Sequence, residues 1–288
     1  MSVEGMHGAV SVVEISPWRT LEARRIDASG AFSAAACDTA EETPIAFSYG
    51  GIAHAVMMAT PADLHDFAVG FSVSEGIASG VADIGCIEIR ASGDGFELNI
   101  TLAPDAFRAF LSRRRVRSLR GYTSCGLCGV EDMADVERQN AEADRVTLGD
   151  GGSGKIELEA VRAALSALRD FQPLSRQTHA AHAAAWATSQ GSIALVREDV
   201  GRHSALDKLI GACLRANIDM AAGFCVVTSR CSFEMVQKAV AARMPVLVAV
   251  SAPTALAVRR AEAAGLTLIA RANANGQIIY AGPDRIRL

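Results

Sequence analysis

The sequence predicts an α/β protein with two folded units: an N-terminal α+β unit over residues 1–112 and a C-terminal unit over residues 155–288 whose sheet is largely parallel. The 288 residues suggest about two domains. From Lys155 onward, short apolar runs alternate with amphipathic helical stretches, which is the pattern of successive βαβ units. A basic, glycine-rich segment over residues 113–154 separates the two units, and we expect it to be a loop or linker.

The composition is that of a folded protein without a nucleic-acid or membrane partner. Half of the residues are hydrophobic and 21% are charged, so the chain can bury a sizeable core. A net charge of −4 argues against a protein that coats nucleic acid. The N-terminus lacks the basic-then-apolar order of a signal peptide, and no run approaches the roughly 18 apolar residues that cross a bilayer. We therefore expect a cytoplasmic protein.

The N-terminal unit shows one clear hairpin and one clear helix start. Gly50-Gly51 separates two predicted strands over residues 44–49 and 52–58, which indicates a hairpin with a two-glycine turn. Thr60-Pro61 is a helix-start signal, with the threonine as N-cap and the proline at the first helical position. Around them we expect three further strands and one loose segment. These are a strand over 10–15, a loose surface segment over 28–40, and strands over 86–91 and 96–102.

The C-terminal unit is predicted from its regular alternation. Each apolar run is short enough to be a buried strand, and each following stretch has its apolar residues at helical spacing. Three crossovers in a row indicate a sheet that is parallel for most of its width. The predicted helices cover residues 157–170, 204–215, 233–243 and 253–264, and the predicted strands cover 193–196, 224–228, 246–250, 266–270 and 277–280, with an alanine-rich segment at 180–188.

Polar clusters follow three of the predicted strands, at residues 197–203, 229–232 and 251–254. In an open α/β sheet, ligands bind beyond the carboxyl ends of the strands. The helix N-termini, hydroxyls and guanidinium groups in these segments suit a phosphate or pyrophosphate. The charged residues of the first segment fit a structural ion-pair network equally well, and the sequence leaves both interpretations open. These residues are Arg197, Glu198, Asp199 and Arg202.

Cys125 and Cys128 form a C-x-x-C pair in the glycine-rich segment. A zinc site would need two more ligands, and the sequence has no second C-x-x-C and no H-x-x-x-H. A thioredoxin-like redox pair normally opens a helix after a strand, whereas this pair is predicted to lie in a loop. Two cysteines present in an exposed loop by chance are a third interpretation, but free exposed thiols are usually avoided. A sulfur carrier fits best, because nearby arginines lower the pKa of a thiol and a second thiol can release the carried sulfur as a disulfide forms.

The remaining cysteines and histidines narrow the alternatives. The seven cysteines are an odd number, which argues against a disulfide framework, and we expect most of them to be small buried hydrophobes.

Zinc-dependent nucleobase deaminases place a proline before the C-x-x-C pair and a glutamate two residues after a histidine. Here Ser124 precedes the pair, and His182 is followed by Ala183 and Ala184, so the catalytic glutamate is missing, which argues against deamination. The arginines within residues 113–120 fit either a solvated helix end or an attraction for an anionic cofactor or an acidic partner.

Four stretches of the chain form a specific set of motifs. They are residues 123–129 (TSCGLCG), 197–208 (REDVGRHSALDK), 229–236 (SRCSFEMV) and 44–64. This set resembles the FdhD family of formate dehydrogenase accessory sulfurtransferases. The resemblance runs from about Glu41 to the C-terminus.

The resemblance implies a sulfur carrier that accepts a persulfide from a cysteine desulfurase. The sulfur would pass to the molybdenum (or tungsten) bis(molybdopterin guanine dinucleotide) cofactor of formate dehydrogenase or a related molybdoenzyme. Cys125 would carry the persulfide and Cys128 would assist it. The resemblance also implies a homodimer and a three-layer C-terminal domain similar to cytidine deaminases, and we expect no permanently bound metal. The expected cofactor-binding residues are Arg202, His203, Arg230, Arg271, Ala272, Asn273, Ala274, Asn275 and Gly276.

The chain departs from the family pattern at two places. His179 and Ala180 stand where the family has a glycine pair before its histidine, here His182, and residues 271–276 lack the family's aromatic and basic residues. Two competing classes of function also stay open. One is a non-enzymatic chaperone that binds and delivers the cofactor without handling sulfur, and the other is a structural zinc protein.

Overall fold

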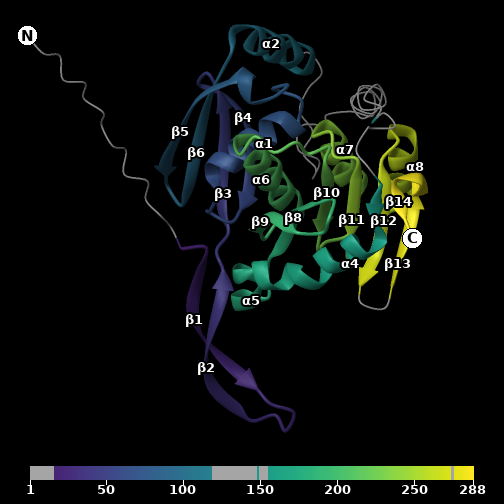
Figure 1. The fold of residues 1–288 in the computed structure, drawn as a ribbon. Coiled ribbons are helices and arrows are strands. Elements are labelled where there is room, and N and C mark those ends of the chain that lie inside the picture. The colour runs from purple at the N-terminus through teal and green to yellow at the C-terminus, as the bar shows by residue number, and fades with distance from the viewer. Residues whose placement is uncertain (1–15, 119–147, 149–154, 274–275) are drawn as a thin grey trace, which may run out of the picture.

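The computed structural model describes residues 16–118, 148, 155–273 and 276–288, with only the backbone for 114–118. Figure 1 shows three parts: a two-stranded ribbon that extends from the body, a four-stranded sheet packed on a helix, and a six-stranded sheet between helices. The strand predicted at residues 10–15 lies outside the described residues. The predicted class, an α+β part followed by an α/β part, is confirmed.

The N-terminal ribbon consists of β1 (Trp18–Ile26) and β2 (Phe32–Ala40), paired antiparallel from Trp18↔Ala40 to Ile26↔Phe32. The Asp27 carboxylate closes the turn by accepting hydrogen bonds from the backbone N–H groups of Ser29 (2.8 Å) and Ala31 (3.1 Å). The prediction of a loose segment over residues 28–40 is wrong. Nearly every residue of the ribbon is exposed, so the strands leave no alternating apolar pattern in the sequence.

The four-stranded sheet has the order β4-β3-β6-β5. Its predicted hairpin is confirmed, with Gly50 (φ 57°) and Gly51 (φ 78°) in the left-handed turn positions that glycine favours. The aromatic rings of Phe47, Phe67 and Phe71 pack between this sheet and helix α1, with Phe47 and Phe71 stacked at 4.3 Å between centroids. The elements of this unit are β3 (Thr43–Tyr49), β4 (Ile52–Ala59), α1 (Leu64–Ser74), η1 (Val81–Asp83), β5 (Ile84–Ser92), β6 (Gly95–Leu102) and α2 (Pro104–Ser118).

Two predictions for this unit need correction. The helix begins at Leu64, with Asp63 at the N-cap in a left-handed conformation, so the assignment of Thr60 as N-cap is wrong. Thr60 instead faces the C-terminal unit, where its backbone N–H donates to Asp199 at 3.0 Å. Helix α2 also extends through Ser118, so that residues 113–118 of the segment expected to be a loop are helical. The rest of that segment lies outside the described residues, apart from Leu148.

The six-stranded sheet has the order β13-β12-β11-β10-β8-β9. β9, β10, β11 and β12 run in one direction, as predicted, whereas β8 and β13 run antiparallel to their neighbours. Only a few residues of chain separate β8 from β9 and β12 from β13, and a short connection between neighbouring strands requires an antiparallel pair. The strands are β8 (His182–Thr188), β9 (Ile193–Asp199), β10 (Gly223–Val227), β11 (Val246–Ala249), β12 (Thr267–Asn273) and β13 (Gly276–Ala281).

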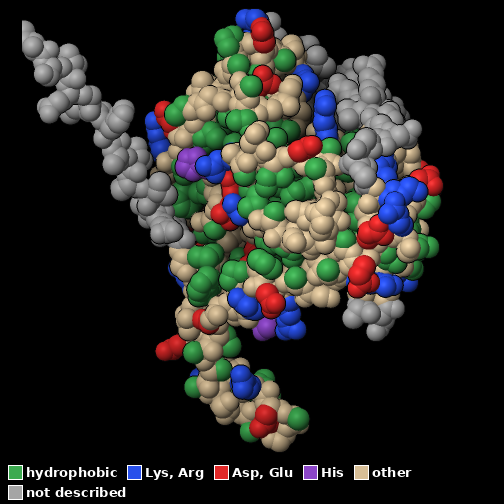
Figure 2. Space-filling model, viewed as in Figure 1, with side chains coloured by type: hydrophobic (Ala, Val, Ile, Leu, Met, Phe, Trp, Pro, Cys, Tyr) green, Lys and Arg blue, Asp and Glu red, His purple; other side chains and the backbone are tan. Residues whose placement is uncertain are grey.

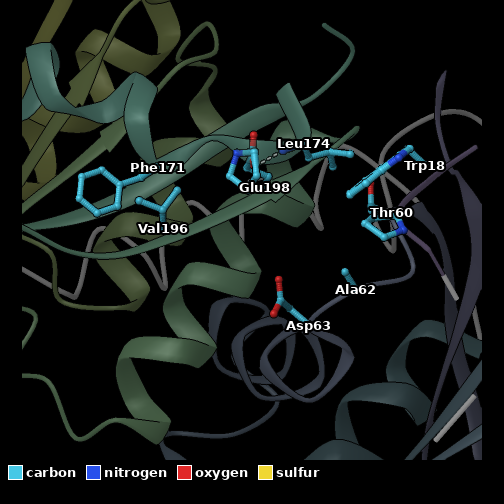
Figure 3. A pocket seen from close by; sticks show the side chains of 10 residues that line it. Trp18, Thr60, Ala62, Asp63, Phe171, Leu174, Val196 and Glu198 are labelled. Atoms are coloured by element: carbon cyan, nitrogen blue, oxygen red, sulfur yellow. Dashed lines mark hydrogen bonds between the residues drawn. The ribbon is translucent and has the colours of Figure 1, made fainter. Parts of the chain in front are cut away.

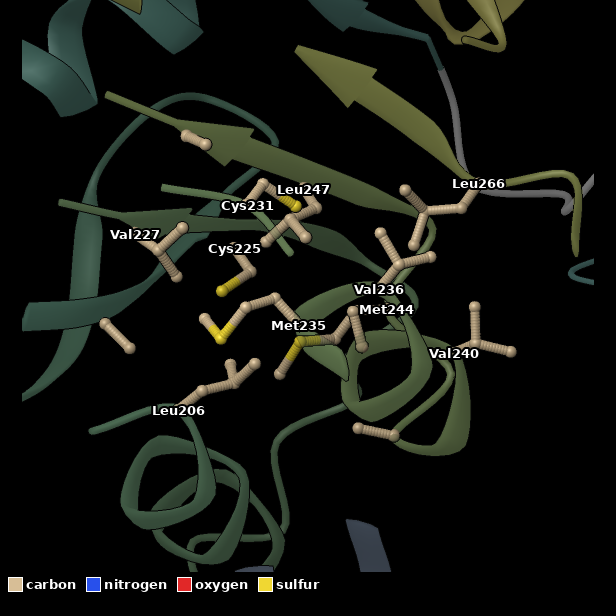
Figure 4. Packing of buried hydrophobic residues seen from close by; sticks show 14 of the residues in the cluster. Leu206, Cys225, Val227, Cys231, Met235, Val236, Val240, Met244, Leu247 and Leu266 are labelled. Atoms are coloured by element: carbon tan, nitrogen blue, oxygen red, sulfur yellow. The ribbon is translucent and has the colours of Figure 1, made fainter. Parts of the chain in front are cut away.

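Helices cover both faces of this sheet and form three layers with it (Figure 1). The apolar faces of α6, α7 and α8 pack on one side, and α4 with the short pair β7–β14 packs on the other. Figure 4 shows Cys225, Cys231 and Met235 in the first of these interfaces. The elements are β7 (Ile156–Glu157), α4 (Leu158–Ala167), η2 (Leu168–Phe171), α5 (Pro173–Thr178), α6 (Arg202–Arg215), α7 (Phe233–Ala241), α8 (Ala255–Ala264), η3 (Pro283–Arg285) and β14 (Ile286–Arg287).

The two units are joined where α1 crosses α6. A Cβ atom at Gly70 of α1 would lie 1.7 Å from the carbonyl oxygen of Asp207, and one at Gly211 of α6 would lie 1.9 Å from the carbonyl oxygen of Asp66. Both positions therefore need glycine, because the two backbones are in contact there. This crossing fixes α6, and with it the helix N-terminus that carries Arg202 and His203.

Candidate functional site

The polar strand ends of the C-terminal unit meet along one edge of the sheet. His182, the first residue of β8, pairs with Asp199, the last residue of β9. The next loop is attached through Thr228, whose backbone N–H donates to the carbonyl of Ala183 at 3.0 Å. Cys231 N–H donates to Ala252 O at 3.2 Å, and Arg271 N–H donates to Ser251 O at 3.1 Å. The structure therefore brings together, side by side, the loops that the sequence placed at strand ends.

Three arginines of this edge have no acidic partner among the described residues. They are Arg202 at the start of α6, Arg230 in the β10–α7 loop and Arg271 near the end of β12. Arg202 is half-buried, and its Nε–H is buried without an acceptor in the described part of the chain. An orphaned guanidinium donor costs free energy unless a ligand or water accepts its hydrogen bond. The edge therefore has the charge and the free donor that an anionic ligand requires.

Two histidines at the same edge are shifted toward their neutral forms. Burial lowers the pKa of His182, and the positive charges of Arg202 and Arg230 lower it further, so both guanidinium groups act on this ring. Burial also lowers the pKa of His203 to about 4, with the charges of Arg202 and Lys238 adding to the effect. The Nε2 atom of His203 lies 3.5 Å from the Ser232 hydroxyl. At neutral pH both rings are uncharged, so each can donate or accept a hydrogen bond to a bound ligand.

The neighbouring charged residues are structural. Arg197 pairs with Asp66 of α1 at 2.7 Å. Both carboxylate oxygens of Glu198 accept backbone N–H groups at the start of α5, each at 2.8 Å. Asp199 pairs with Lys208 at 2.6 Å, and both side chains are fully buried. Of the two interpretations that the sequence left open, the ion-pair network is therefore correct for Arg197, Glu198 and Asp199, while Arg202 has no ion-pair partner in that network.

A second buried ion pair involves Asp207, the residue before Lys208 in α6. The Lys238 ammonium is 3.0 Å from Asp207 and 2.7 Å from Glu75, and it donates to the Ser74 hydroxyl at 3.0 Å. Burial raises the pKa of Asp207 to about 6, although Lys238 opposes the shift. These residues connect α7 and α6 to the C-terminal end of α1. The sequence did not reveal this cluster, because Ser74, Glu75 and Lys238 are far from Asp207 along the chain and lie outside the motifs.

The sequence did not indicate that His182 lies beside Arg202 and Arg230. It was considered only as a possible metal ligand of a deaminase and as the histidine of the family pattern. The available signal was the direction of β8. If the alanine-rich segment at 180–188 is an antiparallel strand, its first residue lies at the edge where its neighbours end. Small residues without alternation gave no basis for that assignment.

Several predicted site residues lie outside the described residues: Cys125, Cys128, Ala274 and Asn275. Among the cysteines that are described, Cys213, Cys225 and Cys231 are buried, as expected, whereas Cys37 and Cys86 lie exposed on strands. Burial raises the pKa of Cys213 and of Cys231 to about 12, so neither is a nucleophile at neutral pH. No described helix has the length and apolar character to cross a membrane.

The fold and the site define a two-unit α/β protein in which three arginines gather at the strand-end edge of the larger sheet. The crystal structure described as a formate dehydrogenase accessory protein from Desulfotalea psychrophila shares this fold, with a TM-score of 0.70 and 20% sequence identity over 94% of this chain and 99% of that chain. The model of the FdhD/NarQ family matches residues 40–287. The chain belongs to the FdhD/NarQ family.

Curated relatives agree with this assignment over most of their length. The protein named sulfur carrier protein FdhD from Xanthomonas euvesicatoria pv. vesicatoria is 49% identical over 249 residues, which cover 86% of this chain and 85% of that protein. The protein of the same name from Cupriavidus necator is 46% identical over 250 residues, which cover 87% of this chain and 84% of that protein. Residues 40–287, which the family model matches, include the strand-end arginines and the C-x-x-C pair.

Proposed function

We propose that this chain is a sulfurtransferase that carries sulfur as a persulfide on Cys125 and delivers it to a molybdenum bis(molybdopterin guanine dinucleotide) cofactor for formate dehydrogenase or a related molybdoenzyme. The observation that carries the proposal is the set of guanidinium groups at the strand-end edge that have no acidic partner in the described part of the chain, with the buried Nε–H of Arg202, which has no acceptor there, among them. The names of the curated relatives and the family assignment support the same function.

The first step is an exchange between sulfur atoms. The Cys125 thiolate attacks the terminal sulfur of a persulfide on a cysteine desulfurase, so that one S–S bond forms as the donor's S–S bond breaks and the donor cysteine leaves as a thiolate. This step needs no external oxidant or reductant. In a later step, Cys128 can attack the inner sulfur of Cys125, which forms a disulfide and releases the terminal sulfur as hydrosulfide.

The role of the sheet edge is to bind the nucleotide ends of the cofactor, which is the client and not a resident group. Arg202 and Arg230 would pair with phosphate oxygens, and the neutral His203 would donate or accept a hydrogen bond. Arg271 and its neighbours through Gly276 would extend the contact along the edge. The further expectations, a cytoplasmic location and a homodimer, belong to the same proposal.

The carrier is tested by intact-mass measurement after incubation with a cysteine desulfurase and cysteine. We expect the wild-type chain to gain the mass of one sulfur atom and to lose it on treatment with a thiol reductant. Cys125→Ala should show no gain, because the proposal places the persulfide on Cys125 and every thiol that the structure describes is either buried or outside the C-x-x-C motif. Cys37→Ala, an exposed cysteine of the ribbon, is the control and should gain sulfur like the wild type. No gain on the wild type would contradict the carrier and favour the cofactor chaperone.

The nucleotide site is tested with GDP as the probe. Arg202→Ala and Arg230→Ala are each expected to weaken GDP binding at least tenfold by calorimetry, because a charged hydrogen bond contributes about 1.5–3 kcal/mol. Arg90→Ala removes an exposed arginine of β5, in the N-terminal unit, and should leave the affinity unchanged. Unchanged binding in both edge variants would remove the site from the proposal.

A further inference from the structure

A cavity of about 190 Å³ lies where the two units meet the base of the N-terminal ribbon. Its lining comes from the start of β1, the connection between β4 and α1, the η2–α5 segment and the C-terminal half of β9. In Figure 2, hydrophobic side chains gather on the surface where the ribbon joins the body. Ligand sites are often apolar cavities between folded units, with a few polar groups that orient the ligand. None of Arg202, Arg230 and Arg271 lines this cavity, so it is not the nucleotide site.

Aromatic side chains stand on two sides of the cavity. Figure 3 shows Trp18 on one side and Phe171, next to Val196, on the other. Phe171 is 47% exposed and Trp18 is partly exposed, so neither ring is enclosed by its own chain. The face of an aromatic ring attracts a cation, and tryptophan does so most strongly. A dry cavity of roughly 150 Å³ holds a benzene molecule, so this space accommodates one ring or a short alkyl chain.

Asp63 lines the cavity with a carboxylate that makes few contacts. Its backbone is left-handed (φ 56°, ψ 34°), which is uncommon for a residue other than glycine, and strain of this kind gathers at ligand sites. The carboxylate makes no capping hydrogen bond to α1. Its ion pair with Arg197 is 3.5 Å long, because that guanidinium is already bound to Asp66 at 2.7 Å. The Asp63 side chain is 39% exposed, so a ligand can reach it.

The residues that line the cavity carry negative charge and no positive charge. Asp63 and Glu198 line it, whereas no lysine, arginine or histidine of the described chain does. Burial raises the pKa of Glu198, and two backbone N–H groups of α5 oppose that shift, so its carboxylate is already engaged. The positive charges that act on these carboxylates, Arg197 on Asp63 and Arg176 on Glu198, lie outside the lining. A ligand in the cavity therefore meets aromatic rings and one accessible carboxylate.

We propose that this cavity binds a small organic cation, with its ammonium or guanidinium group on Asp63 and its carbon skeleton between Trp18 and Phe171. This site goes beyond the proposed sulfur transfer and shares no residue with it. A free amine and the lysine or arginine side chain of another protein present the same chemistry. The cavity has the volume of a single ring, so the ligand is one ring or one side chain in size.

Trp18 provides a reporter for the first test. The chain has two tryptophans, and the other, Trp186, is only 2% exposed. We expect benzylammonium to change the tryptophan fluorescence of the full chain in a saturable way, and the change should be absent in Trp18→Phe. Benzyl alcohol has the same ring without the charge and should bind at least about tenfold more weakly. No saturable change with benzylammonium, or equal binding of benzyl alcohol, would overturn the proposal.

The source of the cation is tested with a second probe in the same titration. N-acetyl-arginine methylamide presents a guanidinium side chain together with its backbone. Tighter binding of this probe than of benzylammonium assigns the cavity to a side chain of another protein, and tighter binding of benzylammonium assigns it to a free amine. Binding of neither probe would overturn the proposal.

The role of Asp63 is tested by calorimetry with benzylammonium. Asp63→Asn should weaken binding at least about tenfold, because it removes the charge, and asparagine tolerates the left-handed backbone as aspartate does. Its Tm should therefore stay close to that of the wild type. Phe171→Ala should weaken binding about threefold through the lost ring. Asp94→Asn removes an exposed carboxylate in the turn between β5 and β6 and should bind like the wild type. Equal affinities for Asp63→Asn and Asp94→Asn would overturn the site.

Discussion

Replacing Lys208 with methionine is expected to lower the free energy of unfolding by about 3–5 kcal/mol. The Lys208 ammonium is completely buried, 2.6 Å from Asp199 and 2.8 Å from the carbonyl oxygen of Thr60. Methionine fills similar space but leaves the Asp199 carboxylate buried with only the backbone N–H groups of Thr60 and Gly201 as donors. Urea denaturation of the full chain measures the loss.

The pH dependence of this loss identifies its cause. Burial raises the pKa of Asp199 above its ordinary value of 3.8, and Lys208 opposes that shift. Without the lysine, the folded state holds a proton that the unfolded state releases, so the deficit should grow as the pH rises above about 4. Adding Asp199→Asn should recover part of the loss at neutral pH. Lys155→Met removes an exposed lysine and should change stability by less than about 0.5 kcal/mol. Equal losses for the two lysine variants would contradict the buried pair.

Gly211→Ala is expected to destabilise the protein strongly. Overpacking typically lowers the free energy of unfolding by about 1–3 kcal/mol, and the loss here should be larger. In an ordinary helix this substitution stabilises by up to about 1 kcal/mol, so the expected sign is opposite. The reason is the 1.9 Å separation between the new Cβ and the carbonyl oxygen of Asp66, which only a shift of α1 against α6 can relieve. Thermal unfolding should show a clear fall in Tm.

The matched control for this variant is Gly80→Ala, where a Cβ would meet no atom within 4 Å and the backbone is extended. Its Tm should stay close to that of the wild type. If Gly211→Ala were as stable as Gly80→Ala, the helices would not be in backbone contact.

The sequence was sufficient to predict the helices and strands that have a buried face. The alternation from residue 193 to residue 270 predicted each crossover, because β10, β11 and most of β12 are buried and α7 and α8 each have an apolar face. The hairpin at Gly50-Gly51 was equally clear, since only its turn needs residues with positive φ. The placement of Arg202 and Arg230 at one edge followed from the same reasoning, because parallel strands end together.

Elements without that signal could not be predicted. The ribbon has no buried face, and β8 is almost entirely small residues, so neither shows a period. Thr60 has the sequence of a helix cap, but its backbone is held instead by the buried Asp199. The contact of Gly70 with Gly211 joins residues far apart in the chain, and only the packed helices reveal why both are glycine.

Helix α6 has a mechanical consequence that none of its residues has alone. Its first turn presents Arg202 and His203 to the candidate ligand site, and its middle is clamped to the other unit through Lys208 and Gly211. A helix of 14 residues is a rod about 21 Å long that does not compress. A tilt of the N-terminal unit would therefore move Arg202 at the end of this helix. Docking of a partner on the N-terminal unit would then change the position of Arg202 in the candidate ligand site of the other unit.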